Sequence, residues 1–566
     1  MSDPTSTRAD ILLHGGHLLD PAGEDPEGDA IALADGRILA VGFTQRLAQL
    51  CDAQTSRIDC SGLTLMPGLI DGHAHLDREG LKDALPSLSG VTSIARIQDI
   101  LRGEVARHAP GDWIILSPLG SAPLYLDGWR GLVDGRCPDR HDLDAVAPDN
   151  PVWIRPIWGY WSNMPDLTSV ANTVALERAG IGTGTRSPHG LVTIHTDAKG
   201  LPDGRFSERT RMSIVEMTLM AAAPGFDLRT RVDALQRSVA RYARFGTTGV
   251  FEGHGVAHEV LDAYQALRRR GGACLRAQLV ISPSWTGKTS GGDIPALLED
   301  WSAWARRRLD PDDQIRVDGI YAEIDETDEP WLRAQGAPRT GWAGFHLDSG
   351  ASRTMIRELL LEAARQKLRI STIFDDVMAL MAEVDRIHPI AGLAWTRGHV
   401  AVMDEDTIAR VADMGLFLVT HTNRHIAKGA SAHLARIGKA RESDIVPLRR
   451  LLNAGIPVAL GSDNLPPSLW HAIADVELRR DHATGAVVGE DQSLTRRQAL
   501  TLATVGGARL LAREQDLGRL GPGYLADIAG FRANILTVPA EELRWQEAEL
   551  TLVGGRVIHR ADRPDA

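Results

Sequence analysis

The chain lacks long apolar stretches. None of its 566 residues belongs to an apolar run that approaches the roughly 18 residues needed to cross a bilayer. The start, MSDPTSTRADILLHGG, has neither the basic segment nor the apolar segment of a secretory signal. The four cysteines show no CxxC or zinc-ribbon spacing and are expected to be reduced. These absences predict a cytoplasmic protein with no membrane partner.

Positive charge is not in excess either. Lys and Arg number 62 against 74 Asp and Glu, and the net charge of -12 is spread along the sequence. This balance argues against nucleic acid as a partner. The 56 glycines and 29 prolines suit a globular chain with many strand–loop–helix junctions. We therefore expect a small molecule as the main binding partner.

The most chemically dense segment reads LIDGHAHLD, from Leu69 to Asp77. An apolar run from Leu65 to Ile70 leads into two histidines separated by one residue. Side chains at i and i+2 of a strand point the same way, so His73 and His75 would present two imidazoles to one point. That is half of a transition-metal site. The alternative is a strand end that carries two histidines by chance, because short motifs recur freely.

A second segment, GIPVALGSD, ends in Asp463 after an apolar strand. Asp463 by itself could cap a helix, the commoner role for an Asp after a strand. Together with PGLIDGHAH it resembles the last and first barrel strands of the amidohydrolase superfamily, whose members are metal-dependent hydrolases on a TIM barrel. The resemblance implies that His73 and His75 bind a metal. It also implies that Asp463 binds the metal and accepts the proton of the attacking water.

Both ends of the chain are rich in short strands, as in DAIALADGRILAVG and LTLVGGRVIH. We predict that residues 1–64 and 515–566 form one composite small β domain, a β-sandwich, and that the barrel occupies 65–514. The passages DGRILAVG and PGYLADIAGF resemble amidohydrolases in the same way. Two unrelated β tails are the alternative, but each would have little core.

Residues 82–230 break the barrel rhythm and are predicted to be an insertion after strand one. LDAVAPDNPVW and the tryptophans around it resemble the YtcJ-like branch (amidohydrolase family 3), which includes N-substituted formamide deformylases. The insertion should cover the barrel mouth as a lid. Where relatives carry a histidine this chain has Trp158 to Trp161, so Trp161 is a candidate substrate contact. Tryptophan suits an apolar or aromatic small molecule, although it also fills cores.

Seven further segments read as barrel strands and alternate with amphipathic helices. They are TTGVFEGHG, CLRAQLVISP, IRVDGIYAEID, LRISTIFDD, AWTRGHV, GLFLVTH and IPVALGSD. Such alternation implies parallel strands, and eight strands imply a closed α/β barrel of the TIM type. Catalytic residues should then lie at the carboxyl ends of the strands.

His399 follows the sixth strand in TRGHV, where relatives carry a Glu-His pair and this chain has Gly398. With His73, His75 and Asp463 it would give three nitrogens and a carboxylate, a suitable first shell for one Zn²⁺ or another divalent ion. His399 could instead polarise the substrate carbonyl, or be a surface histidine.

Two strand ends depart from the pattern that the resemblance implies. Tyr321 and Thr372 stand where relatives place a ligand, and neutral hydroxyls are poor zinc donors. One metal ion is therefore expected. Water, or a histidine from a neighbouring strand, would replace the missing ligand. His254 and His421 are the nearest candidates; both, like Tyr321, are also candidate substrate contacts.

Three more residues near strand ends are ambiguous. His346, in GFHLD, is either a further site residue or a solvated loop residue. Asp375 and Asp376 follow strand five, where capping of the next helix is their more frequent role.

The leading functional hypothesis is hydrolysis of a non-peptide C–N bond, with Asp463 as the general base. A lyase or decarboxylase on the same fold is the first alternative. A binding protein that has lost a competent metal site is the second. Relatives are often dimers, so the resemblance allows a homodimer.

Overall fold

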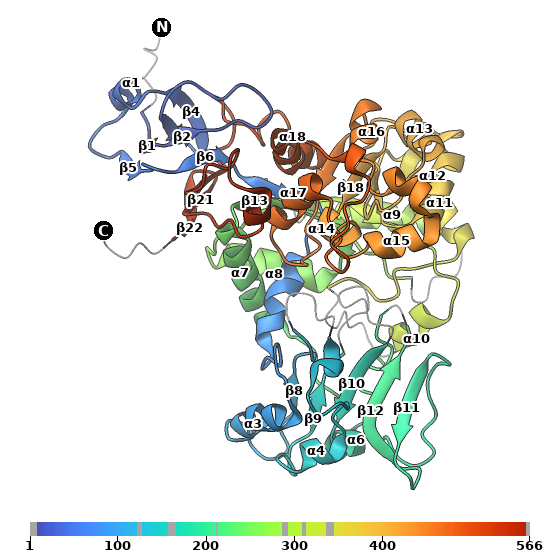
Figure 1. The fold of residues 1–566 in the computed structure, drawn as a ribbon. Helices are drawn as coiled ribbons and strands as arrows, with labels where there is room; N and C mark the ends of the chain where they lie inside the picture. The colour runs from blue at the N-terminus through green and yellow to red at the C-terminus, as the bar shows by residue number, and fades with distance from the viewer. Residues whose placement is uncertain are drawn as a thin grey trace.

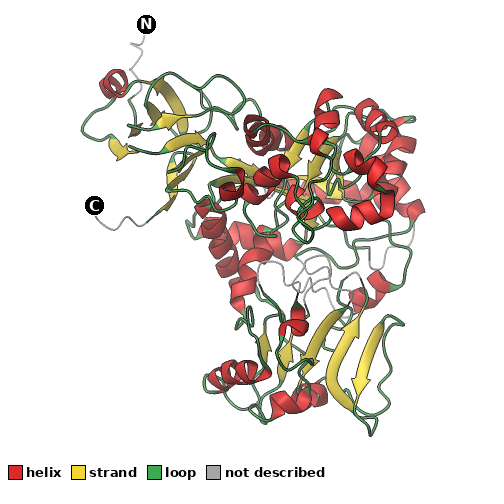
Figure 2. Ribbon diagram, viewed as in Figure 1, coloured by secondary structure: helices red, strands yellow, loops and turns green. Residues whose placement is uncertain are grey.

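The computed structural model describes residues 8–121, 127–156, 166–210, 212–285, 293–307, 313–335 and 344–561. Figure 1 shows three regions: a β-rich end that contains both termini, a barrel surrounded by helices, and a separate layer of strands below the barrel. Figure 2 shows the strands of the barrel inside a ring of helices.

Eight parallel strands form the barrel, which confirms the predicted fold class. Their order in the sheet follows the chain, and every neighbouring pair is parallel. Across the remaining seam the Gly72 amide donates to the Leu460 carbonyl at 2.8 Å, so the barrel is nearly closed. The strands are β7 (Leu69–Asp71), β13 (Thr247–Val256), β14 (Arg276–Ile281), β15 (Ile315–Tyr321), β16 (Ile370–Thr372), β17 (Thr396–Arg397), β18 (Phe417–Thr420) and β19 (Val458–Leu460).

Amphipathic helices cover the outside of the barrel. In α11 the buried residues Ile356, Leu359, Leu360 and Ala363 recur at the three- and four-residue spacing of one helix face, and the Ser352 side chain caps its first turn. The other covering helices are α7 (Leu228–Arg244), α8 (His258–Arg269), α9 (Ile294–Arg307), α12 (Asp375–Asp385), α13 (Glu405–Asp413), α16 (Leu448–Asn453) and α17 (Leu469–Leu478); α11 is Arg353–Arg365.

The barrel interior is a packed core and not a pore. One apolar cluster joins residues of six barrel strands, among them Ile70, Phe251, Val280, Tyr321 and Val419. Leu510, Leu511 and Leu517 belong to the same cluster. Polar side chains therefore gather beyond the strand ends, as the fold predicts.

The two ends of the chain share one sheet. β6 (Thr64–Pro67) pairs with β20 (Ile528–Phe531), in the order β2-β6-β20-β21-β22. The other members are β2 (His17–Leu18), β21 (Leu550–Val553) and β22 (Arg556–Arg560). A second sheet holds β4 (Arg37–Gly42), β3 (Ala30–Ala34), β1 (Ile11–His14) and β5 (Ser56–Asp59). The exact domain boundaries stay a prediction.

The apolar run Leu65–Ile70 is not one strand. It breaks at Gly68, so that β6 belongs to the terminal sheet and β7 to the barrel. The Gly68 amide donates to the Asp527 carbonyl, and the Leu69 amide donates to the Gly246 carbonyl in the barrel wall. The proline-glycine pair thus marks the crossing from one sheet to the other.

A five-stranded sheet follows β7 and precedes β13, at the position predicted for the insertion. Its order is β11-β12-β10-β9-β8. Met212 and Met217, which follow it, pack against Phe345, Leu347 and Leu465 from loops at the carboxyl ends of the barrel strands. The strands are β8 (Ile114–Leu116), β9 (Val152–Ile154), β10 (Leu167–Ala171), β11 (Val192–Thr196) and β12 (Pro202–Glu208). Within the described ranges, no helix has the length and apolar character to span a membrane.

Candidate metal centre

The two histidines of HAH lie just beyond β7 and not on it, because the strand ends at Asp71. The Asp71 carboxylate accepts the amides of His73 and Ser462, both at 3.0 Å, and so ties the loop after β7 to the loop after β19. Asn464 accepts the His75 amide at 3.1 Å and donates to the His75 carbonyl at 2.7 Å. Strand alternation therefore does not explain why the two side chains point the same way, because neither histidine lies on the strand. The two rings still come together, with centroids 4.9 Å apart.

His399 and Asp463 both adopt a left-handed backbone, with φ of 54° in each case. Such a conformation is costly for a residue with a side chain, and it clusters at functional sites. The Asp463 amide donates to the His73 carbonyl at 3.0 Å, which fixes the turn after β19. A strained backbone conformation therefore orients these two side chains toward the barrel mouth.

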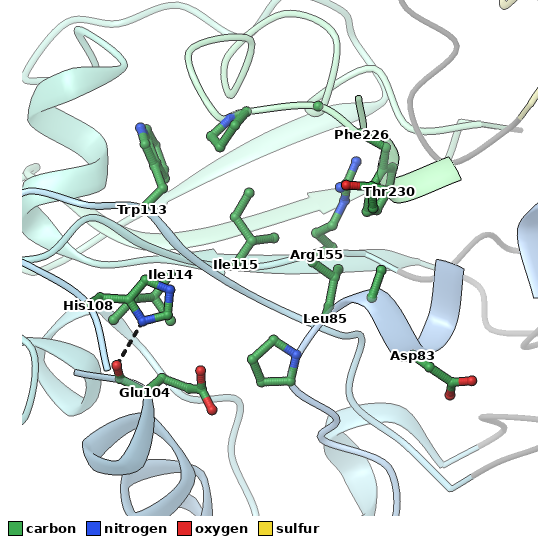
Figure 3. A pocket seen from close by; sticks show the side chains of 14 residues that line it. Asp83, Leu85, Glu104, His108, Trp113, Ile114, Ile115, Arg155, Phe226 and Thr230 are labelled. Carbon is green, nitrogen blue, oxygen red and sulfur yellow. Dashed lines mark hydrogen bonds between the residues drawn. The ribbon is translucent and has the colours of Figure 1, made fainter. Parts of the chain in front are cut away.

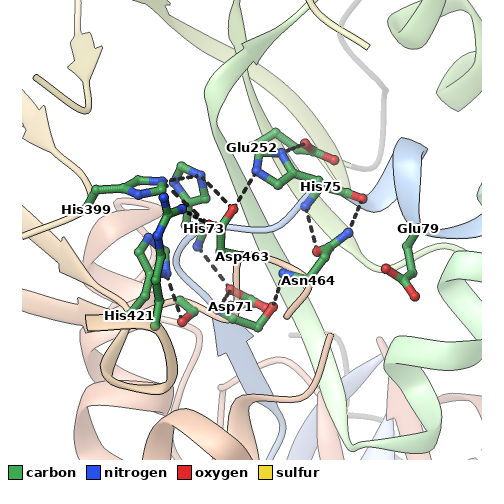
Figure 4. Close-up of polar contacts among 12 residues, drawn as sticks. Asp71, His73, His75, Glu79, Glu252, His399, His421, Asp463 and Asn464 are labelled. Carbon is green, nitrogen blue, oxygen red and sulfur yellow. Dashed lines mark hydrogen bonds and ion pairs between the residues drawn. The ribbon is translucent and has the colours of Figure 1, made fainter. Parts of the chain in front are cut away.

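The four predicted ligands converge at the barrel mouth (Figure 4). His75 Nε2 lies 3.0 Å from Asp463 Oδ1, and His73 Nε2 lies 3.8 Å from the same oxygen. His399 Nε2 is 3.3 Å from His73 Nε2 and 3.9 Å from Asp463 Oδ2. Donors that follow β7, β17 and β19 thus face one another.

These separations fit a metal ion. Two nitrogens on a tetrahedral zinc ion, each about 2.0–2.1 Å from it, lie about 3.3 Å apart. The His73 and His399 Nε2 atoms are 3.3 Å apart. In one pair of tautomers one imidazole donates to the other, whereas a shared cation would satisfy the lone pairs of both. The residues therefore fit a divalent transition metal.

Electrostatics keep the donors in the form that a metal requires. Burial lowers the pKa of His75 to about 3 and holds the pKa values of His73 and His399 well below their ordinary range. Burial acts to raise the pKa of Asp463, but His399, the hydrogen bond from His75 and nearby Arg424 outweigh it and hold that pKa well below its usual value. Neutral imidazoles and a carboxylate are the ligand forms of these groups.

Comparison with known proteins identifies the family of this chain. The amidohydrolase family model matches residues 57–559. This chain belongs to the amidohydrolase family, as the sequence motifs predicted. It is 24% identical to YtcJ of Bacillus subtilis (strain 168), named as a putative amidohydrolase, over 97% of this chain and 99% of that protein. It is 23% identical to the N-substituted formamide deformylase of Arthrobacter pascens, over 93% and 94% of the two chains.

Solved structures share the fold of this amidohydrolase. An uncharacterized metal-dependent hydrolase from Pyrococcus horikoshii OT3 superposes with a TM-score of 0.67 at 18% identity, and the match covers 94% of this chain and 99% of the other. An adenosine deaminase from Xanthomonas campestris, solved with bound zinc, gives a TM-score of 0.52 at 15% identity, over 97% and 93%. Both likenesses concern the fold.

Two ionisable residues of the centre were not predicted from the sequence as part of it. Arg424 Nη1 binds Asp463 Oδ2 at 2.6 Å. Glu252 lies 3.9 Å from His75 Nδ1 and accepts the Leu76 amide at 2.7 Å. Burial raises the pKa of Glu252 to about 8. The only signal for Arg424 was its place three residues after His421, one turn along a helix.

Two of the remaining candidate contacts, His254 and Tyr321, lie near this centre. His254 lies on β13, and its ring is 4.8 Å from that of Tyr321. His73, His75 and His254 offer ligand atoms within 4.8 Å of one another. Tyr321 is buried within the barrel core. Trp161 lies outside the described residues. Their predicted roles toward a substrate stay predictions.

The helix-capping expectation for the carboxylates after β16 is wrong. The N-cap of α12 is Phe374, whose amide donates to Thr372 Oγ1 at 3.2 Å. Asp375 instead pairs with Arg397 at 2.8 Å, and Asp376 accepts the amide of the next residue. The helix begins one residue too early for either carboxylate to occupy the cap.

His346 belongs to neither group of clustered histidines, that of His73, His399 and His421 or that of His73, His75 and His254. Its Nδ1 interacts with the Ser282 carbonyl at 2.7 Å.

A pocket of about 550 Å³ is lined by residues of the 82–230 insertion (Figure 3). Its lining includes Trp113, Arg155 and Phe226, and Arg155 is already paired with Glu216. His108 interacts there with the Glu104 carbonyl at 2.8 Å. None of the clustered histidines lines this pocket. The histidine cluster at the barrel mouth is therefore separate from this pocket.

Proposed function

We propose that this amidohydrolase is a metal-dependent hydrolase that cleaves a non-peptide C–N bond of a small molecule. The observation that carries the proposal is the group of His73, His75, His399 and Asp463 at the barrel mouth. Each of the three imidazoles has a nitrogen 3.0–3.9 Å from an Asp463 oxygen, and the His73 and His399 Nε2 atoms are 3.3 Å apart. Full-length similarity to an N-substituted formamide deformylase supports an amide-type bond. A neighbour in fold described as a metal-dependent hydrolase is consistent with the cation.

His73, His75, His399 and Asp463 would hold the metal, zinc or a similar divalent ion. When bound, such an ion lowers the pKa of a coordinated water towards about 7 and polarises the scissile carbonyl. The chain's own residues do the rest. Asp463 is ionised and buried, so it can accept a proton from the attacking water and return it to the leaving amine. Arg424 pairs with Asp463 Oδ2 and lowers the basicity of this carboxylate.

Outer contacts keep the donors aligned for this task. Asn464 clamps the His75 backbone on both its amide and its carbonyl, and the Tyr242 hydroxyl donates to the same Asn464 oxygen. Asp71 holds the His73 amide. Preorganisation of this kind lowers the cost of assembling the reactive geometry.

The test is a hydrolysis assay on one preparation in two states. Metal-stripped protein and protein reconstituted with Zn²⁺ or Mn²⁺ are compared on a panel of formamides, amides, ureas and cyclic amides. We expect amine release only in the reconstituted sample. No hydrolysis across the panel by metal-replete protein would contradict the proposal, and CO₂ release without net water consumption would identify a lyase instead.

A further inference from the structure

His421 lies where a fifth donor would reach the metal centre. It follows β18 directly and precedes the short helix α14 (Thr422–His425), and its side chain is fully buried. Its ring centroid is 4.4 Å from that of His399 and 4.8 Å from that of His73. One ligand atom of each of the three histidines lies within 4.8 Å of the others. Figure 4 shows the His421 ring beside the His399 ring.

The hydrogen bonding of His421 leaves the lone pair of one ring nitrogen unused. Its Nδ1 lies 3.0 Å from the Gly461 carbonyl, and a carbonyl can only accept, so Nδ1 carries the proton. Nε2 is then an acceptor, and it is buried without a hydrogen-bond partner among the described residues. An unsatisfied buried polar atom costs about 1–3 kcal/mol. A ligating histidine characteristically donates its other N–H to a carbonyl or a carboxylate, which is the arrangement seen here.

The absence of a side chain at Gly461 leaves space for the His421 ring. A Cβ on Gly461 would lie 2.7 Å from His421 Cε1 and 2.8 Å from His73 Cβ, closer than carbon atoms approach. Only glycine lets both imidazoles pack against this turn. At the end of β16, by contrast, Thr372 presents a hydroxyl that accepts the Phe374 amide. The nitrogen that β16 does not supply is available from β18.

We propose that His421 is a metal ligand of this chain, which joins His73 and His399 in a three-nitrogen face for a divalent transition ion. The inference rests on the proposed function, because it concerns the same centre. It specifies that β18 replaces β16 as the source of a donor. If His421 contacted only the substrate, its Nε2 would not bind the ion.

The first experiment compares two variants of the full-length protein. His421→Gln keeps a side chain that can still donate to the Gly461 carbonyl. His425→Gln is the matched control, because His425 is also buried, but its ring lies 6.0 Å from those of His399 and His421. Zinc affinity is measured by competition with a chromophoric chelator, and the Co²⁺ form is examined by its visible absorption.

We expect His421→Gln to weaken zinc binding by more than the about 10–100-fold that loss of an outer-shell partner costs. Its Co²⁺ spectrum should change, while His425→Gln stays within a few-fold of wild type. Wild-type affinity and an unchanged Co²⁺ spectrum in His421→Gln would overturn the inference. Wild-type protein that binds no metal at all would overturn the proposed function as well, so the two failures are distinguishable.

A second measurement does not depend on the variant folding. Crystals of zinc-loaded wild-type protein are measured on both sides of the zinc absorption edge, and an anomalous peak locates the ion. An ion within about 2.0–2.2 Å of His421 Nε2 is the expected result. An ion held by His73, His75 and Asp463 but more than about 3 Å from His421 Nε2 would contradict the ligand assignment and leave the proposed hydrolase intact.

Discussion

Gly461→Ala should damage the centre without replacing any ligand. The added Cβ would lie 2.7 Å from His421 Cε1 and 2.8 Å from His73 Cβ. Ordinary carbon contacts begin at about 3.5 Å, so the His421 ring and the His73 Cβ must each move by roughly 0.7–0.8 Å. Metal–ligand distances tolerate only about 0.2 Å. The forced movement therefore exceeds what a bound ion accepts.

Two effects of Gly461→Ala follow from this misfit. The free energy of unfolding of metal-free protein should fall by about 1–3 kcal/mol, as for other overpacked sites. Zinc affinity should fall by at least about 10-fold, because His73 can no longer hold its position. Urea unfolding and chelator competition measure the two quantities.

The control for this substitution is Gly182→Ala. No atom lies within 4 Å of the position that a Cβ on Gly182 would take, and its φ is ordinary, so neither quantity should change. A Gly461→Ala protein that binds zinc as tightly as wild type would refute the reasoning, since it would mean that the two rings do not need their present positions.

Three further changes probe the same centre. His73→Ala should abolish stoichiometric metal binding by elemental analysis; full metal occupancy would show that the ligand set is wrong. Asp463→Asn should lower kcat at least about 10²-fold, as expected for loss of a general base. The exposed Asp375→Asn control should stay near wild type, and equal effects would remove the special role of Asp463. Burial lowers the pKa of His421 to about 4 from its ordinary 6.5, so between these values only the unfolded chain takes up this proton. As the pH falls below 6.5, metal-free wild type should therefore lose stability relative to His421→Gln, by at most about 1.4 kcal/mol per pH unit. Urea unfolding measures this quantity. A difference in unfolding free energy between the two proteins that does not change with pH would contradict the burial of His421.

The fold was readable from the sequence because each barrel strand combines a short apolar run with a polar end. Repetition of that pattern between amphipathic helices leaves few alternatives to a parallel barrel. The strand boundaries were less accurate: β17 covers only Thr396–Arg397, and β7 ends before the histidines. Local sequence does not show where ladder hydrogen bonds stop, since this depends on the neighbouring strand.

Only part of the metal centre could be predicted from the sequence. His73, His75, His399 and Asp463 converge as their positions at strand ends suggested. The contact of Arg424 with Asp463 was not foreseen, because it depends on how a helix turn after β18 faces the loop after β19. Pairings between loops of different strands are set by tertiary packing, which a single sequence does not encode locally.

The most direct test of the central claim is metal stoichiometry coupled to activity. Protein stripped by a chelator is titrated with zinc, and bound metal and amine release from a formamide and amide panel are measured on the same samples. We expect about one equivalent of zinc to bind and activity to rise in proportion to it. Less than roughly 0.2 equivalents after supplementation would contradict the account, because a site with several buried protein ligands holds its metal tightly.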